Sequence, residues 1–185
     1  MTRVTLVVNR HDAPSETFQR TLAATLASGG HEVTVHALRG AATPTPMPGI
    51  STSHGAPPLR PRSAPRLLAD LVRGPEHGLA VAARRARDRF GNGARAGRAA
   101  LVAGPIIDTR PDVVHLGFSG IWVAIRDALD LLDGIALVVS CRGTDELVHP
   151  LLDPARGEAL GELLGRVGRI HVVADAVGDA VVALG

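Results

Sequence analysis

Apolar residues along this chain occur in short continuous runs, and these alternate with longer stretches in which apolar residues recur every three or four positions. The first run, Val4 to Val8, precedes a helical pattern from Ser15 to Gly29, and a second run extends from Val33 to Leu38. Short apolar runs are typical of buried strands, and the longer spaced pattern is typical of amphipathic helices. The beginning of the chain therefore predicts a strand, a helix and a second, parallel strand.

The same alternation returns after residue 111. Three more apolar runs predict strands, and a helical pattern comes after each of them. Because these runs contain few polar residues, helices should cover both faces of the sheet. With right-handed crossovers, the elements form a single Rossmann-like α/β domain with a doubly wound parallel sheet, in the order 3-2-1-4-5-6 or a close variant. The predicted strands are 112–116, 135–141 and 170–174, and the predicted helices are 121–132, 155–167 and 175–184.

The segment from about 40 to 65 differs from the rest of the chain, because it holds seven of the thirteen prolines, with Ser, Thr and Gly between them. Such a pattern is incompatible with a central strand or a stable helix, so it predicts a long surface loop. Helical spacing resumes at 66–72, and a second helical run begins at His77 and extends to about Phe90.

Composition narrows the classes of function. Aromatic residues make up only 2% of the chain and tyrosine is absent, which disfavours binding of single-stranded nucleic acid by stacking. No recognition-helix motif is evident either, so we expect no nucleic-acid partner. The lone Cys141 cannot form an internal disulfide, and no metal site is predicted around it. Neither a signal peptide nor an apolar stretch of about 18 residues is found, so we expect a cytoplasmic location.

Charge is distributed unevenly, and every basic residue is arginine. Residues 1–110 carry 15 arginines against 7 acidic residues, whereas residues 111–185 carry 5 against 11. Arg84, Arg85 and Arg87 lie in the second helical run, where a basic helical face could contact an anion or lipid headgroups. If the glycine break at 91–93 is ignored, Arg95 and Arg98 extend that face on one ideal helix. The alternative is an ordinary solvated face.

The loop after the first strand carries the first candidate site residues. In a parallel sheet, ligands bind beyond the carboxyl ends of the strands, and a helix start offers free N–H groups to an anion. Ser15 and Thr17 are placed at this helix start, where Ser15 could equally act only as a cap. Glu16 could contact substrate or stabilise the helix dipole. Residues 9–18 contain no glycine, which argues against a nicotinamide dinucleotide site.

Four short motifs occur along the chain in the order and approximate spacing of one known family. They are Asn9-Arg10-His11-Asp12-Ala13-Pro14-Ser15-Glu16-Thr17-Phe18 with the later Gly30-His31-Glu32-Val33-Thr34-Val35, then Pro111-Asp112-Val113-Val114-His115, Ser140-Cys141-Arg142-Gly143-Thr144-Asp145, and Arg169-Ile170-His171-Val172-Val173-Ala174. With these motifs the chain resembles the amino-terminal half of family 4 glycosyltransferases, which are retaining enzymes of the two-domain GT-B architecture. The resemblance covers nearly the whole chain apart from residues 40–105.

The resemblance implies that residues 1–185 form the acceptor-binding half of a hexosyltransferase-type enzyme. Such an enzyme transfers a sugar from a nucleotide-sugar to a glycan, glycolipid or small-molecule acceptor, as in polysaccharide biosynthesis, and needs no cofactor besides its donor substrate. In the family, most donor-binding groups lie in a carboxyl-terminal domain, which we expect to lie outside residues 1–185. We therefore expect the chain to be inactive alone and to need that half in cis or in trans. Family members acting on lipid-linked acceptors often attach to the membrane through this half, which here would be at its inner face.

His115 is the candidate catalytic residue, because it ends the third clear strand and could orient a sugar hydroxyl or accept a proton. The alternative is a structural histidine whose hydrogen bonds are satisfied within the fold. Gly117 lies in the next loop, where glycine permits close backbone approach, and it stands where many relatives carry a second histidine.

The next strand ends in Arg142-Gly143-Thr144-Asp145, which we expect to bind substrate. Arg142 could pair with a phosphate or an acidic sugar, because guanidinium donates charge-assisted hydrogen bonds to such groups. Thr144 and Asp145 could hydrogen-bond hydroxyls or simply cap the following turn. A function from another class also remains open, namely a stand-alone Rossmann-like module that holds a phosphorylated small molecule with the Ser15 loop and Arg142.

Overall fold

The computed structural model describes residues 1–11, 17–39, 47–55 and 77–185, and these form one α/β domain around a six-stranded parallel sheet. The strands are β1 (Arg3–Val8), β2 (Glu32–Ala37), β3 (Ile50–His54), β4 (Val113–Leu116), β5 (Ala136–Cys141) and β6 (Arg169–Val172). The helices are α1 (Thr17–Ser28), α3 (Gly78–Phe90), α4 (Ala94–Asp108), α5 (Ser119–Leu129), α6 (His149–Leu152), α7 (Pro154–Leu164) and α8 (Asp175–Leu184), with a π-helical segment, η3 (Thr144–Val148), before α6.

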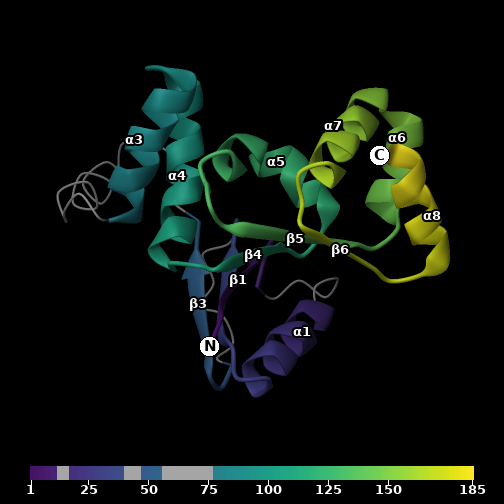
Figure 1. Cartoon of the computed structure of the whole chain (residues 1–185), viewed down its shortest axis with the longest axis horizontal. Coiled ribbons are helices and arrows are strands. Elements are labelled where there is room, and N and C mark those ends of the chain that lie inside the picture. Colours follow the sequence, from purple (N-terminus) through teal and green to yellow (C-terminus); the bar gives the residue numbers. More distant parts are fainter. Residues whose placement is uncertain (12–16, 40–46, 56–76) are drawn as a thin grey trace.

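The strand order is β3-β2-β1-β4-β5-β6, and all pairings are parallel. This confirms the predicted Rossmann-like class and the predicted order. Helices lie on both sides of the sheet, with α1 on one side and α3, α4, α5 and α7 on the other (Figure 1). The carboxyl ends of the strands therefore form one shared edge, where loops from distant parts of the sequence meet.

Strand β3 corrects the prediction for the proline-rich segment, because residues expected to lie in a surface loop form the sixth strand. The seven residues from Gly49 to Gly55 contain no proline, so their N–H groups can pair. β3 lies at the edge of the sheet, and β2 is its neighbouring strand among the described residues. An edge position tolerates the exposed Ser51 and Thr52. Because of these polar residues, the strand lacks the apolar run that predicts a buried strand. The other parts of the predicted loop, and the helical pattern at 66–72, lie outside the described residues.

The larger hydrophobic core lies on the side of α3, α4, α5, α7 and α8. Val7, Val114 and Val139 project into it from the central strands, and Trp122 of α5 is fully buried there. The two helices α3 and α4 contribute mainly alanines, as a chain with few aromatics must. Cys141 also lies buried in this core, unpaired, and burial raises the pKa of its thiol.

Helices α3 and α4 form an antiparallel hairpin through the glycine-rich turn at 91–93. Gly78 packs against the backbone of Gly104, and its N–H donates to the Asp108 carboxylate at 2.6 Å. The turn corrects the idea of one continuous arginine face, because residues 84–87 and 95–98 belong to two different helices. Arg95 instead pairs with Asp127 of α5 at 2.8 Å.

The opposite side of the sheet carries a smaller core under α1, which packs on β1, β2 and β3. Leu6, Val8 and Val35 face Ala23 of the helix. In Figure 1, no other drawn helix lies on this side. Strand β6 has all four residues exposed, so this end of the sheet is open within the described part of the chain. In that same part, no helix is long and apolar enough to span a membrane.

Candidate carboxyl-edge site

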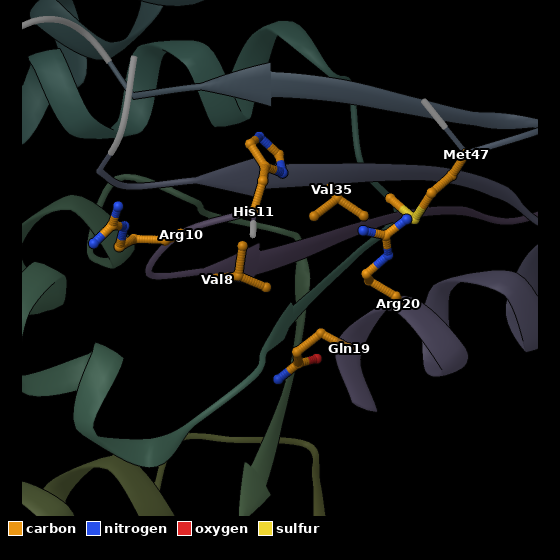
Figure 2. Close-up of a pocket in the computed structure, with 7 residues that line it drawn as sticks. All are labelled: Val8, Arg10, His11, Gln19, Arg20, Val35 and Met47. Carbon is orange, nitrogen blue, oxygen red and sulfur yellow. The ribbon is translucent and has the colours of Figure 1, made fainter. Parts of the chain in front are cut away.

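A pocket opens where β1 and β2 end beside the first turns of α1 (Figure 2). In that view Val8 and Val35 lie between Arg10 on one side and Arg20 with Met47 on the other. Its cavity volume is only about 10 Å³, which is room for about one water molecule and far below the several hundred Å³ of typical small-molecule sites. The pocket is therefore too small to hold a ligand as it stands in this structure. Its lining residues are Val8, Arg10, His11, Gln19, Arg20, Val35 and Met47.

Gln19 connects this pocket to the loop after β4. Its side chain is 2% exposed, and its Nε2 donates to the Gly117 carbonyl oxygen at 2.8 Å. The Gly117 N–H in turn donates to the Val7 carbonyl at 2.9 Å. A Cβ at position 117 would overlap the Gln19 amide, so only glycine permits this approach. A histidine at this position would therefore require Gln19 to move.

Arg142 lies half-buried at the carboxyl end of β5, over the ring of Phe18, with 3.1 Å from its Cζ to the ring centroid. Phe18 makes an edge contact with Phe118, with 5.4 Å between the ring centroids. Desolvation lowers the pKa of Arg142, although guanidinium keeps its proton in proteins. The stacked arrangement therefore holds a permanent positive charge beside the helix α1 start, the loop after β4 and the loop after β5.

The turn after Arg142 is held by a buried carboxylate. Glu146, 5% exposed, accepts hydrogen bonds from the Arg142 N–H at 3.2 Å, the Gly143 N–H at 2.8 Å and the Ser119 hydroxyl. Gly143 has a φ of +121°, a conformation that strongly favours glycine. Gly143 thus serves the shape of the loop, and Glu146 ties that loop to the start of α5.

Asp145 faces the helices rather than the open edge. Its carboxylate accepts from the Gly120 N–H at 3.1 Å, from Arg156 at 2.5 Å and from His149 at 2.8 Å. Asp145 therefore links α5 with α6 and α7, and its part in substrate binding stays a prediction. Thr144 is exposed at the first position of η3, where its hydroxyl is accessible.

His115 lies within β4, with its side chain on the α1 side of the sheet, and is only 8% exposed. Its Nε2 is hydrogen-bonded to the Ser140 hydroxyl of β5 at 2.9 Å. Burial, with a smaller contribution from His171, lowers the pKa of His115 to about 4. The imidazole is therefore neutral at pH 7 and only weakly basic, which suits orientation of a hydroxyl better than storage of a proton.

The other predicted site residues that the structure describes lie apart from one another. Thr17 is exposed at the start of α1, and Ser15 and Glu16 lie outside the described residues. Arg84 and Arg87 are exposed on α3, whereas Arg85 turns inward and donates to the Leu131 carbonyl at 2.6 Å. Within the described ranges, no group of histidine, cysteine and acidic residues could hold a metal ion.

Sequence reasoning missed Phe18, Gln19, Ser140 and Glu146 as parts of this edge. Phe18 belongs to the first motif and Ser140 opens the third, so the motifs themselves carried a signal for two of the four. Nothing in the local pattern distinguishes Gln19, because it bonds a residue of another element. Glu146 did have a local signal, since it stands three residues after Gly143, where a glutamate can accept from the N-cap N–H.

These features define a Rossmann-like α/β domain with cationic and hydrogen-bonding groups at the carboxyl edge of its sheet. Residues 15–185 match the family model described as a glycosyl transferase 4-like domain. The chain therefore belongs to this family, which confirms the family-level resemblance found in the sequence. No match was found among curated proteins. Membership identifies a glycosyltransferase-type module and indicates transferase activity in general.

Proposed function

We propose that this chain is the acceptor-binding, amino-terminal half of a retaining GT-B glycosyltransferase. In this proposal the enzyme transfers a sugar from a nucleotide-sugar to a glycan, glycolipid or small-molecule acceptor. Two findings support the proposal: the family match over residues 15–185, and the polar groups at the carboxyl edge. A second, donor-binding half acts with it, in the same polypeptide or as a partner.

The observation that carries the proposal is the placement of Arg142 over Phe18. A guanidinium held against an aromatic ring loses little further freedom when it binds, so its hydrogen bonds to a ligand cost less entropy. It lies where three loops meet, next to the Gln19 and Gly117 contact. Arg142 is therefore assigned to bind an acidic or phosphorylated part of the substrate.

His115 is assigned to orient the acceptor hydroxyl. Its neutral imidazole at pH 7 can donate from one ring nitrogen and accept at the other, and one nitrogen is already fixed by Ser140. Positioning of a reacting hydroxyl lowers the barrier without a change of charge on the enzyme.

The test uses a complete enzyme that contains this domain, with Arg142→Ala compared against Arg126→Ala. Arg126 is an exposed arginine of α5 that pairs loosely with Glu162 at 3.9 Å. Loss of one positioned hydrogen bond costs roughly 1–3 kcal/mol, so Arg142→Ala should lower kcat/KM about tenfold to a hundredfold while Arg126→Ala stays near wild type. Equal activity of both variants would place the site elsewhere.

The rival function is a stand-alone module for a phosphorylated small molecule. Calorimetry on this chain distinguishes it from our proposal. Our proposal predicts weak or absent affinity for nucleotide-sugars and for simple sugar phosphates without the second half. Micromolar binding of a sugar phosphate to the isolated chain, lost in Arg142→Ala, would instead favour the binding module.

Contact with an anionic membrane surface is a further part of the proposal, and it rests on the exposed Arg84 and Arg87. Arg85 of the same helix is not part of this exposed surface, because its guanidinium donates to the Leu131 carbonyl. Binding to vesicles that contain anionic lipid should fall when Arg84 and Arg87 are both changed to serine, and should weaken with added salt. Unchanged vesicle binding by the double variant would remove the membrane contact.

A further inference from the structure

Three polar side chains form a row across β4, β5 and β6 on the α1 side of the sheet. His115 Nε2 lies 2.9 Å from Ser140 Oγ, and Ser140 Oγ lies 3.3 Å from His171 Nδ1. The first two side chains are buried, at 8% and 1% exposure, whereas His171 is exposed. A single hydroxyl therefore connects a buried imidazole with one that reaches solvent.

The serine hydroxyl has one proton to donate, and it can accept hydrogen bonds at its lone pairs. Among the described residues, Ser140 Oγ has no hydrogen-bond partner besides the two histidines. If both imidazoles donated to Ser140, its buried O–H would have no acceptor, which costs free energy. The satisfied arrangements are therefore those in which one imidazole donates to Ser140 and the other accepts from it.

Two such arrangements exist while His171 is neutral. In one, His115 carries its proton on Nε2 and donates to Ser140, which donates to His171 Nδ1. In the other, His171 donates from Nδ1 and Ser140 donates to His115 Nε2, so the proton of His115 resides on Nδ1. Once His171 is protonated, both of its nitrogens carry a proton, and only the second arrangement remains satisfied.

We propose that His171 is a positioning residue that sets, through the Ser140 hydroxyl, which ring nitrogen of His115 carries the proton. Protonation of His171 selects the form of His115 with its proton on Nδ1. In that form Nδ1 can only donate to a ligand, whereas in the other form it can only accept. The consequence for transfer rests on the proposed role of His115, but the tautomer change itself does not.

Two arginines share the α1 side of the sheet with this row. On β6, Arg169 lies two residues before His171 and shares its face, and Arg142 lies two residues after Ser140 at the end of β5. The β1 residue paired with His115 is the uncharged Leu6, and the α1 residue under Arg142 is the uncharged Phe18. A positive His171 also lowers the pKa of His115, so the two rings do not hold charges together.

The experiment is ¹⁵N NMR of histidine-labelled full chain between pH 5 and 8, because the chemical shifts of Nδ1 and Nε2 report tautomer and charge directly. We expect His115 to stay neutral over this range while its proton moves to Nδ1 at the same midpoint at which His171 becomes charged. In Ser140→Ala and His171→Gln the His115 shifts should stop following pH, and Ser140→Thr should restore the coupling. His31→Gln, in the turn before β2, is the matched control and should leave it intact.

Shifts of His115 that are constant across the titration of His171 would overturn the proposal, as would coupling that survives in Ser140→Ala. A complete enzyme adds a second, separate readout. There, the pH profile of kcat should lose one inflection in His171→Gln, with KM for the donor unchanged. Coupled NMR titrations together with an unaltered kcat profile would preserve the tautomer assignment and refute the role of His115 in transfer.

Discussion

The two sides of the sheet each hold one buried histidine bonded to a serine of the neighbouring parallel strand, yet the two sites differ in access to water. On the side of α3 and α4, His36 is fully buried, and its Nδ1 lies 2.8 Å from Ser53 Oγ. On the α1 side, His115 is bonded to Ser140 at 2.9 Å. Burial, with neighbouring histidines as a smaller cause, lowers the pKa of each to about 4.

The two serines differ in their second hydrogen-bond partner. The hydroxyl of Ser140 also hydrogen-bonds the exposed His171. Within the described part of the chain, the hydroxyl of Ser53 is bonded to His36 only. The other nitrogen of His36, Nε2, is buried without a hydrogen-bond partner there. The same pair of residue types thus has different neighbours on the two sides of the sheet. Ser140 contacts a second, exposed histidine, whereas Ser53 does not within the described residues.

The largest expected effect is acid destabilisation from both histidines. An unfolded histidine titrates near pH 6.5, so between about pH 6.5 and 4 the unfolded chain binds protons that folded His36 and His115 do not. The contribution of each histidine to the free energy of unfolding is therefore fully present above pH 6.5. It is lost as the pH falls toward 4, by at most about 3 kcal/mol for each. Urea unfolding of His36→Gln and His115→Gln across this range should show about half of the wild-type pH dependence each.

The side of the sheet under α3 and α4 should also tolerate the least change in shape. A Cβ at Gly78 would overlap the Gly104 carbonyl oxygen and crowd the Asp108 carboxylate, so Gly78→Ala should cost about 3 kcal/mol. Gly97→Ala is the control, because no atom lies within 4 Å of its added Cβ and alanine favours the helix by up to about 1 kcal/mol. A Gly78→Ala protein with wild-type urea midpoint would contradict the packing of this hairpin.

The smallest expected effect sharpens the contrast between the two histidine sites. His171→Gln should change stability at pH 7 by no more than about 0.5 kcal/mol, because His171 is exposed. It should raise the pKa of His115 and leave His36 unchanged, since a positive His171 lowers only the former. His54→Gln should raise the pKa of His36 and leave the pKa of His115 unchanged. NMR titration of both buried rings in each variant measures this, and crossed effects would show that the two sites are not independent.

The sequence by itself determined the class of sheet, its strand order and the family. Strand and helix type depend on local periodicity, because apolar spacing involves neighbours only a few residues away. Five of the six strands were located in this way. The sixth, β3, was missed, because an edge strand with polar residues such as Ser51 lacks the apolar run that marks a buried one. The motif around Arg142 likewise pointed correctly to the carboxyl end of β5.

Only the tertiary structure decided which side chains meet. Gln19 reaches Gly117 across 98 residues, and Arg142 stacks on Phe18 of α1, although no local pattern pairs these positions. The motif also could not tell that Asp145 turns toward Arg156, or that the His115 side chain lies beside Ser140. The physical reason is that the environment of a side chain depends on which strands are neighbours and on which face of the sheet it lies. Those relations exist only after the chain has folded.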